Sequence, residues 1–200
     1  FPMKLGIMQP YFYPYLGYFS LIKNTDRWIV FDTVQYIEHG WINRNRIIHP
    51  SRPEASYITV PLQKHSRETT IDCIRIDSAA DYRQKILGQL TAAYKKRAPY
   101  FKKIYEMVDE ALSRNFTDIV SLNVFTLKQV CGYLEIPFHY EVFSKMDLDM
   151  LPVHDAGEWA LHISAALGAD EYINPPGGMD LFDKEKFQAH SIELSFLEIH

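Results

Sequence analysis

Short apolar runs that suit buried strands alternate along this chain with longer stretches of helical periodicity. Five of the runs are separated by segments long enough for the right-handed helical crossovers that parallel strands require. The pattern predicts an α/β protein with a Rossmann-like, mainly parallel sheet. The five expected strands are 4–8, 27–32, 138–143, 171–173 and 192–197.

An inserted segment of about 54–136 is expected between the second and third of these strands. It begins with two β-branched stretches, 57–62 and 70–77, which predict an antiparallel hairpin closed by the residues between them. At 200 residues the chain is still short enough for a single domain. Three helices should follow the hairpin, over about 78–97, 101–114 and 117–134. Ser78 is the expected cap of the first helix and Thr117 that of the third.

The charge balance limits the partners of the chain. Its 21 Lys and Arg against 25 Asp and Glu give a net charge of −4, which argues against duplex nucleic acid or an anionic membrane as the main partner. No apolar run approaches the roughly 18 residues of a membrane span, and no secretion signal is visible, so we predict a cytoplasmic protein without membrane insertion. The two cysteines suggest neither a disulfide framework nor a metal site. The sequence leaves the oligomeric state open.

Aromatic side chains gather around the first predicted strand-to-helix turn. Phe, Trp and Tyr make up 14% of the chain, and ten of them lie within residues 11–41. If Pro14 lies in the first helical turn, the backbone N–H groups of Tyr15–Tyr18 form an anion site with no acidic residue nearby. Gly17 would let a ligand approach closely. The alternative is that these aromatic side chains pack in the core beside the sheet.

A polar stretch after the second predicted strand carries two arginines. In an extended Asn43–Arg46 segment, Arg44 and Arg46 would share one face and the asparagines the other. Two neighbouring guanidinium groups suit a diphosphate or carboxylates. The alternative is a surface edge strand whose charges are solvated or paired with Asp32 or Glu38.

The third candidate passage follows the fourth predicted strand. Asn174 can both donate and accept hydrogen bonds, and Gly177 with Gly178 would let the backbone come close to a ligand. An ordinary turn between a strand and a helix would also explain the glycines. In a parallel sheet the loops that begin at Gln9, Asp32 and Asn174 should converge beyond the carboxyl ends of the strands, where ligands bind.

Taken together, the three passages resemble the WbqC-like family. The resemblance covers almost the whole chain and rests on the runs Gln9–Phe19, Trp41–Arg46 and Tyr172–Pro175 with Gly177 and Gly178. It implies a bacterial protein associated with lipopolysaccharide and O-antigen genes, and a transferase that acts on a nucleotide-linked amino sugar as its small-molecule substrate. It also implies a further segment after residue 200, and we expect the two residues before the first Met to be an added remnant.

Under this hypothesis the phosphates are bound by backbone amides of Tyr15–Tyr18 and by the guanidinium groups of Arg44 and Arg46, while Tyr15 or Tyr18 stacks on the base or sugar. The remaining predicted substrate-binding residues are Gln9, Gly17, Tyr36, Asn43, Asn174, Gly177 and Gly178.

The predicted general base is Asp32, because a carboxylate at the carboxyl end of a strand can be partly desolvated. His49 is the second candidate for this role.

The first passage is also similar to the signature of the nucleotidyltransferase superfamily that includes pantothenate synthetases. That signature, His-x-Gly-His at the start of a helix, corresponds to Tyr15–Tyr18, where tyrosines replace both histidines. In such a degenerate nucleotidyltransferase, tyrosine hydroxyls such as that of Tyr18 would be catalytic and Mg²⁺ would carry the phosphate charge. A third hypothesis is a non-enzymatic module that binds a sugar nucleotide or a glycan.

Two further clusters give weaker signals. His154, Asp155, Glu158 and His162 could hold a metal, but their spacing favours capping and solvent-exposed roles, so no metal site is predicted. The basic stretch 95–103 favours a solvated helix end that complements the helix dipole over an RNA site.

Overall fold

The structure is a computed structural model that describes residues 2–198, and the chain divides into two compact units. Unit 1 comprises Phe1–Gln9, Tyr15–Phe31 and Cys131–His200, and unit 2 comprises Pro10–Pro14 and Asp32–Val130. The short segment between the first strand and the first helix therefore belongs to the second unit, together with the polar stretch after the second strand.

Unit 1 contains the parallel sheet that the alternation of apolar runs predicts. In the described part of the chain its strands lie in the order β5-β2-β1-β6-β7, and every neighbouring pair is parallel. The central strand is β1, whose Gly6 pairs with Trp28 on one side and Ile173 on the other. The bounds are β1 (Lys4–Met8), β2 (Arg27–Val30), β5 (Tyr140–Val142), β6 (Glu171–Asn174) and β7 (Glu193–Phe196).

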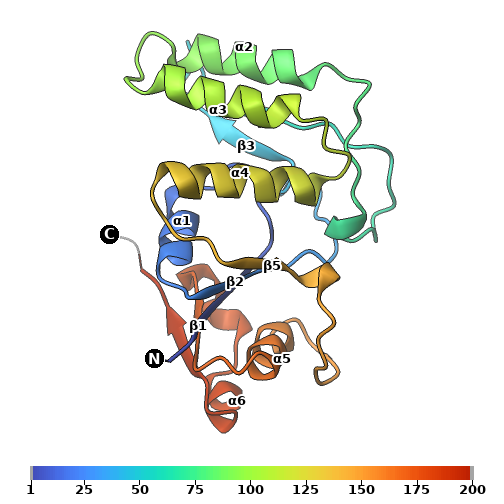
Figure 1. The fold of residues 1–200 in the computed structure, drawn as a ribbon. Coiled ribbons are helices and arrows are strands. Elements are labelled where there is room, and N and C mark those ends of the chain that lie inside the picture. The colour runs from blue at the N-terminus through green and yellow to red at the C-terminus, as the bar shows by residue number, and fades with distance from the viewer. Residues whose placement is uncertain (1, 199–200) are drawn as a thin grey trace. The chain divides into compact units, whose positions relative to one another are not determined.

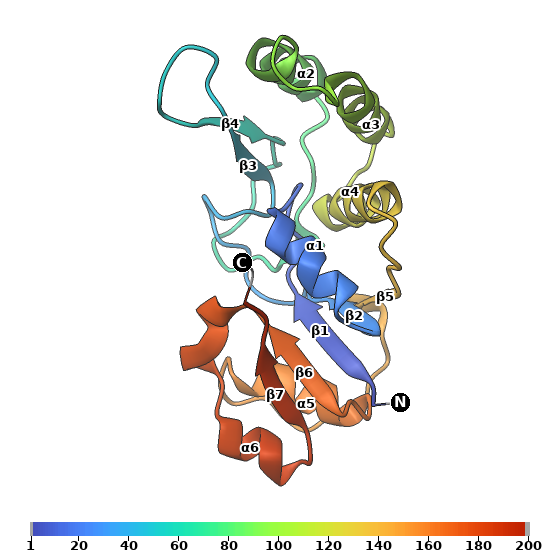
Figure 2. The ribbon, with the colours of Figure 1, turned by 90° about the vertical axis from the view of Figure 1, so that its left-hand side faces the viewer.

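Helices lie on both faces of this sheet. Figures 1 and 2 show α1 on one face, with α5 and α6 on the other. On the face toward α5 and α6 lies a hydrophobic core, in which Leu161, Tyr172 and Phe187 pack with Leu5 and Ile29. The helices of unit 1 are α1 (Leu16–Lys23), α5 (Glu158–Ala166) and α6 (Lys184–Ala189), with the 3₁₀ turns η2 (Phe143–Lys145) and η3 (Pro176–Leu181).

Unit 2 combines a two-stranded sheet with helices. β3 (Arg44–Ile47) pairs antiparallel with β4 (Ser56–Thr59), so that Arg46 lies opposite Tyr57. Figure 1 shows α2 and α3 running side by side in this unit. The helical elements are η1 (Ile71–Cys73), α2 (Tyr82–Tyr94), α3 (Phe101–Ser113) and α4 (Ile119–Tyr133), which continues three residues beyond the unit.

An antiparallel hairpin is present, as predicted, but its regular ladder does not join the predicted stretches 57–62 and 70–77. The first of these stretches pairs with β3, which precedes it in the sequence. The second contains the 3₁₀ turn η1 and is linked to the first by an isolated bridge between Leu62 and Ile76. Pro61 has no backbone N–H to donate, so a strand that begins at 57 cannot extend through 62 as a regular ladder. The polar composition of β3 hid its strand character, because Arg-Asn-Arg carries no apolar face.

Two helix starts also differ from the predictions. α2 begins at Tyr82, where the side chain of Asp81, rather than Ser78, accepts a hydrogen bond from the backbone N–H of Gln84. α1 begins after Tyr15, whose backbone is extended, so Pro14 precedes the helix instead of lying in its first turn.

The third helix of the middle segment has a different cap as well. The Asp118 carboxylate accepts from the backbone N–H of Ser121 at 2.8 Å, which is the role predicted for Thr117. None of the helices among residues 2–198 combines the length and the apolar character that a membrane span requires.

A packing constraint holds the middle of β1 against β2. A Cβ on Gly6 would lie 2.5 Å from Cε3 of Trp28 and 3.1 Å from Cγ2 of Thr25, and the Trp28 side chain is fully buried. Only glycine therefore fits at this position without moving the indole.

We expect Gly6→Ala to lower the free energy of unfolding by about 1–3 kcal/mol, because the buried indole must shift. Urea unfolding followed by circular dichroism measures the change. Gly88→Ala is the matched control, since Gly88 lies exposed inside α2 and a Cβ there meets nothing within 4 Å. Alanine favours a helix interior over glycine by about 0.8–1.0 kcal/mol, so this control should stabilise. Similar losses from both variants would contradict the packing argument.

Candidate functional site

The carboxyl edge of the unit 1 sheet contains its topological switch point. From β1 the chain proceeds to β2 and β5 on one side, and from β6 it proceeds to β7 on the other side. β1 and β6 are neighbours, so the loops that follow them leave the sheet in opposite directions. In open parallel sheets this is the position where ligands bind. Gln9 follows β1 here, and Asn174 ends β6.

The helix that begins at this edge presents backbone donors and two exposed side chains. Tyr15 precedes α1 and makes no side-chain cap, and no acidic residue lies in the first turn. The side chains of Tyr15 and Leu16 are 54% and 77% exposed. The backbone N–H of Tyr18 already donates to the backbone oxygen of Tyr15 at 3.0 Å. The earlier N–H groups of this turn and the positive end of the helix dipole are suited to an anion.

Tyr18 lies inside unit 1. Its ring is fully buried at 5.2 Å from the Trp28 ring, and its hydroxyl donates to the backbone oxygen of Gln9 at 2.9 Å. Gly17 is also buried in α1. Of the aromatic side chains in the Tyr15–Tyr18 tetrad, Tyr15 is therefore the exposed one, and Tyr18 joins the end of β1 to the helix.

Asn174 and its glycines form a close-packed turn after β6. The Asn174 side chain is buried and donates to the Tyr172 hydroxyl at 2.5 Å. Burial raises the pKa of Tyr172, whose ring stacks on Phe187 at 5.7 Å. A Cβ at Gly178 would clash with Oδ1 of Asn174, whereas a Cβ at Gly177 would meet nothing within 4 Å. Gly178 is thus required by the asparagine, and Gly177 leaves open space beside it.

Unit 2 brings its two predicted arginines onto one face of the β3–β4 hairpin, as the alternation of side chains predicts. The guanidinium carbon of Arg44 lies 4.4 Å from the centre of the Tyr57 ring, and that of Arg46 lies 5.2 Å from the Trp41 ring. Arg44 also donates to the backbone oxygens of Gly40, at 3.2 Å, and of His39. Cation–π contacts of this kind orient a guanidinium without neutralising it.

Neither arginine forms an ion pair within the described residues. The side chain of Arg46 is exposed, and its guanidinium donates no hydrogen bond to residues 2–198. Of the alternative interpretation, the pairing with Asp32 or Glu38 is therefore absent from the described residues, whereas a surface strand with solvated charges agrees with what unit 2 shows. The hairpin presents two positive groups, held on aromatic rings, to solvent.

Asn43 and Tyr36 form a buried pair beneath this face. The Tyr36 hydroxyl donates to Oδ1 of Asn43 at 2.8 Å, and Nδ2 of Asn43 donates to the backbone oxygen of Val60 at 2.9 Å. Burial, more than the negative Glu38, raises the pKa of Tyr36, and the positive Arg44 lowers it. These two predicted binding residues are thus engaged in supporting the hairpin.

The two predicted base candidates have different environments in unit 2. Asp32 is 1% exposed, and its backbone oxygen accepts from the N–H of Asp72 at 3.0 Å. His49 is half-buried in the connection between β3 and β4, and its Nδ1 accepts from the backbone N–H of Ser51 at 3.1 Å. A neutral His49 would then carry its proton on Nε2.

Two asparagines that were not among the predicted site residues organise unit 2. Nδ2 of Asn45 donates to the backbone oxygens of Phe12 and Tyr13, at 3.1 and 2.6 Å. Nδ2 of Asn123 donates to those of Pro10 and Ile42, at 2.8 and 2.7 Å. Asn45 lies within the Trp41–Arg46 motif, whereas nothing in the sequence distinguishes Asn123 from the other polar residues of its helix.

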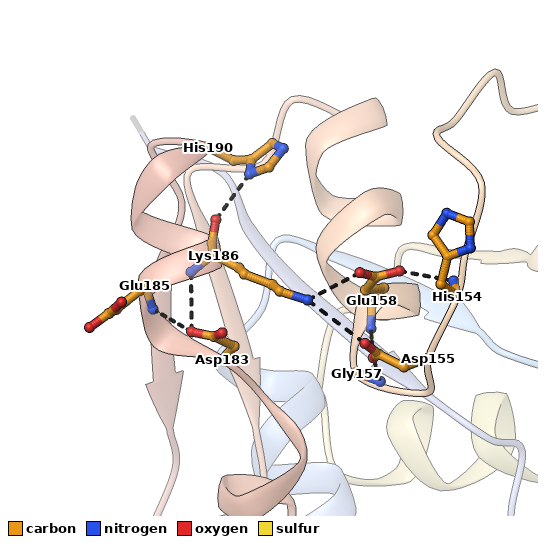
Figure 3. Close-up of polar contacts among 8 residues, drawn as sticks. All are labelled: His154, Asp155, Gly157, Glu158, Asp183, Glu185, Lys186 and His190. Carbon is orange, nitrogen blue, oxygen red and sulfur yellow. Dashed lines mark hydrogen bonds and ion pairs between the residues drawn. The ribbon is translucent and has the colours of Figure 1, made fainter.

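Three members of the weak metal candidate in unit 1, His154, Asp155 and Glu158, form a capping and ion-pair network (Figure 3), whereas the fourth, His162, is buried in α5 and not solvent-exposed as predicted. Oδ1 of Asp155 accepts from the backbone N–H groups of Gly157 and Glu158. The Glu158 carboxylate accepts from the backbone N–H of His154 and from Lys186, and both contacts hold the pKa of Glu158 below its usual value. Among residues 2–198, no group of three or more His, Cys, Asp or Glu side chains is arranged to hold a metal ion.

The parallel sheet of unit 1, with helices on both faces and a topological switch point, places the protein in the class of Rossmann-like α/β proteins. The family model of the WbqC-like protein family matches residues 9–200, and the chain belongs to this family. The uncharacterized protein Rv1507c of Mycobacterium tuberculosis (strain ATCC 25618 / H37Rv) is 26% identical over 201 residues, which cover 98% of this chain and 82% of the relative. No solved structure matches the chain significantly.

We expect Tyr36→Phe to lower the free energy of unfolding by about 1–2 kcal/mol, because it leaves the buried Oδ1 of Asn43 without its donor. Tyr57→Phe is the control, since the Tyr57 side chain is 41% exposed and its ring remains beneath Arg44. Chemical unfolding of the two variants beside the wild type measures the difference. A Tyr36→Phe variant as stable as the control would show that the pair does not support the hairpin.

Proposed function

We propose that the protein is a transferase that binds a nucleotide-linked amino sugar and transfers a group onto it in bacterial surface polysaccharide biosynthesis. The observation that carries the proposal is the pair Arg44 and Arg46, which are stacked on aromatic rings and form no ion pair within the described residues. The polysaccharide setting comes from what the resemblance to the WbqC-like family implies.

The arginine pair supports a diphosphate more than a single carboxylate. Successive outward residues of a strand are about 6.6 Å apart, so two guanidinium groups can each contact one phosphate of a diphosphate. Arg44 already donates to two backbone oxygens, which leaves three of its five N–H donors. Arg46 keeps all of its guanidinium donors free of the described residues. Charge-assisted bonds from such groups are about twice as strong as neutral ones.

Unit 1 supports the same class of ligand on separate grounds. The N-terminus of α1, which has no acidic residue in its first turn, suits a phosphate. The exposed Tyr15 ring suits a base or a sugar, and the switch point between β1 and β6 is where such ligands bind in parallel sheets. Gln9 and Asn174 are the polar groups that end the two central strands. We assign both the orientation of ligand hydroxyls, Asn174 through the N–H that its hydrogen bond to Tyr172 leaves.

Asp32 is the proposed general base. It is a buried carboxylate two residues after the end of β2, and a desolvated carboxylate can accept the proton that an attacking amine loses. His49 is the second candidate. Its Nδ1 accepts a hydrogen bond from the backbone N–H of Ser51, and His49 would have to give up this bond to act as a base.

Arg46→Gln should weaken the binding of a nucleotide diphosphate sugar by about tenfold, because it removes one charge-assisted contact to phosphate. Titration calorimetry with UDP-, GDP- and dTDP-linked amino sugars measures the dissociation constants. Arg52→Gln is the matched control, as an exposed arginine on the connection between β3 and β4. Arg46→Lys should not restore full affinity, since an ammonium group cannot form a bidentate fork. Equal binding by wild type and the Arg44→Gln, Arg46→Gln double variant would refute the phosphate assignment.

Asp32→Asn should retain ligand binding and lose turnover by about 10²-fold or more, because the amide cannot accept the proton. Mass spectrometry of the added nucleotide-linked amino sugar measures turnover as a gain in its mass. The small molecules of a bacterial extract are added to supply the donor of the transferred group. Binding without any mass gain in the wild type would indicate a non-enzymatic module. Pyrophosphate release from a nucleoside triphosphate and a sugar phosphate would instead indicate the nucleotidyltransferase reaction.

A further inference from the structure

The turn between α2 and α3 is the most basic part of the chain. We call residues 95–103 the basic turn; it lies at the upper left of Figure 1, where the two helices meet. Five of its nine residues are Lys or Arg and none is acidic, whereas the whole chain has a net charge of −4. The five are Lys95, Lys96, Arg97, Lys102 and Lys103.

The helix dipole explains only part of this charge. Lys95 and Lys96 follow the C-terminus of α2, where cations are favourable. Lys102 and Lys103 lie in the first turn of α3, where the dipole disfavours cations and which contains no acidic residue, although Glu110 in the same helix interacts electrostatically with Lys103. None of the five basic side chains forms an ion pair within the described part of the chain. Their concentration therefore suits an external anionic partner better than the stability of unit 2.

An apolar cavity of about 210 Å³ adjoins the basic turn. Its wall is formed by apolar and aromatic side chains, among them Leu90, Tyr94, Phe101 and Ile104. The Tyr94 hydroxyl already accepts from the backbone N–H of Ile48, so it does not face an incoming polar ligand unpartnered. Tyr100, at the rim of the cavity, is 68% exposed and makes no side-chain cap for α3.

We propose that the basic turn docks on a membrane surface that contains anionic phospholipids. Cationic side chains around an exposed tyrosine and an apolar cavity match the layered chemistry of such a surface, with phosphate outside and acyl chains beneath. The net charge of the chain does not prevent this, because at physiological salt charges more than about 8 Å away are largely screened. An RNA partner fits less well, since the cavity wall offers no polar groups to read base edges.

Sedimentation with vesicles tests this proposal on the full chain. We expect binding to phosphatidylcholine vesicles that contain about 30% phosphatidylglycerol, weak binding to phosphatidylcholine alone, and loss of binding at high salt. The variant Lys102→Gln with Lys103→Gln should lower the partition coefficient about 25-fold, since each cation contributes roughly fivefold. Tyr100→Ser should lower it severalfold with no change in charge.

Lys145→Gln with Lys184→Gln is the matched control. Both lysines are exposed in unit 1 and the change in net charge is the same, so vesicle binding should stay close to that of the wild type. Equal losses in the two double variants, equal binding to neutral and anionic vesicles, or no binding to anionic vesicles at low salt would each overturn the proposal. So would binding of a mixed-sequence RNA that depends on Lys102 and Lys103 while vesicles are ignored. Affinity for nucleotide sugars is independent of this test.

Discussion

The arrangement of unit 2 depends on side-chain amides that hydrogen-bond to backbone oxygens which no strand or helix can satisfy. The segment Pro10–Pro14 is irregular, and a buried carbonyl without a donor is costly. Asn45 and Asn123 each donate both N–H groups, and together they bond three carbonyls of this segment and that of Ile42. A segment that connects β1 to α1 in the sequence is thereby fixed within unit 2.

Because contacts of this kind join residues distant in the sequence, only the parts of the fold that follow from local patterns could be predicted. The sheet of unit 1 follows from local patterns, because each strand is a short apolar run and each crossover has helical periodicity. The β3–β4 hairpin does not follow from local patterns, because Arg44–Ile47 lacks the alternating apolar residues by which a strand is usually recognised in a sequence. Its position is set by partners distant in the sequence, namely Phe12, Tyr13 and the strand that begins at Ser56. Tertiary contacts of this kind leave no periodic signal.

The candidate site could also be predicted only in part. Strand alternation was enough to place Arg44 and Arg46 on one face, because it depends only on backbone geometry. It could not show that Asn43 is already paired with Tyr36, or that Gly178 is required by Asn174, since both follow from side-chain packing. Polar residues in a functional motif can therefore support its backbone instead of meeting a ligand.

The aromatic excess near the start of the chain is explained mainly by packing within the units. Phe12, Tyr18 and Trp28 are buried, and Trp28 leaves room for nothing larger than glycine at residue 6. Tyr15 is the member of this group that is more than half exposed, and Trp41 lies beneath a guanidinium. Aromatic rings here fill cores and orient the guanidinium groups of two arginines. For that reason the arginines, more than the tyrosines, are the side chains whose substitution best separates a binding role from a structural one.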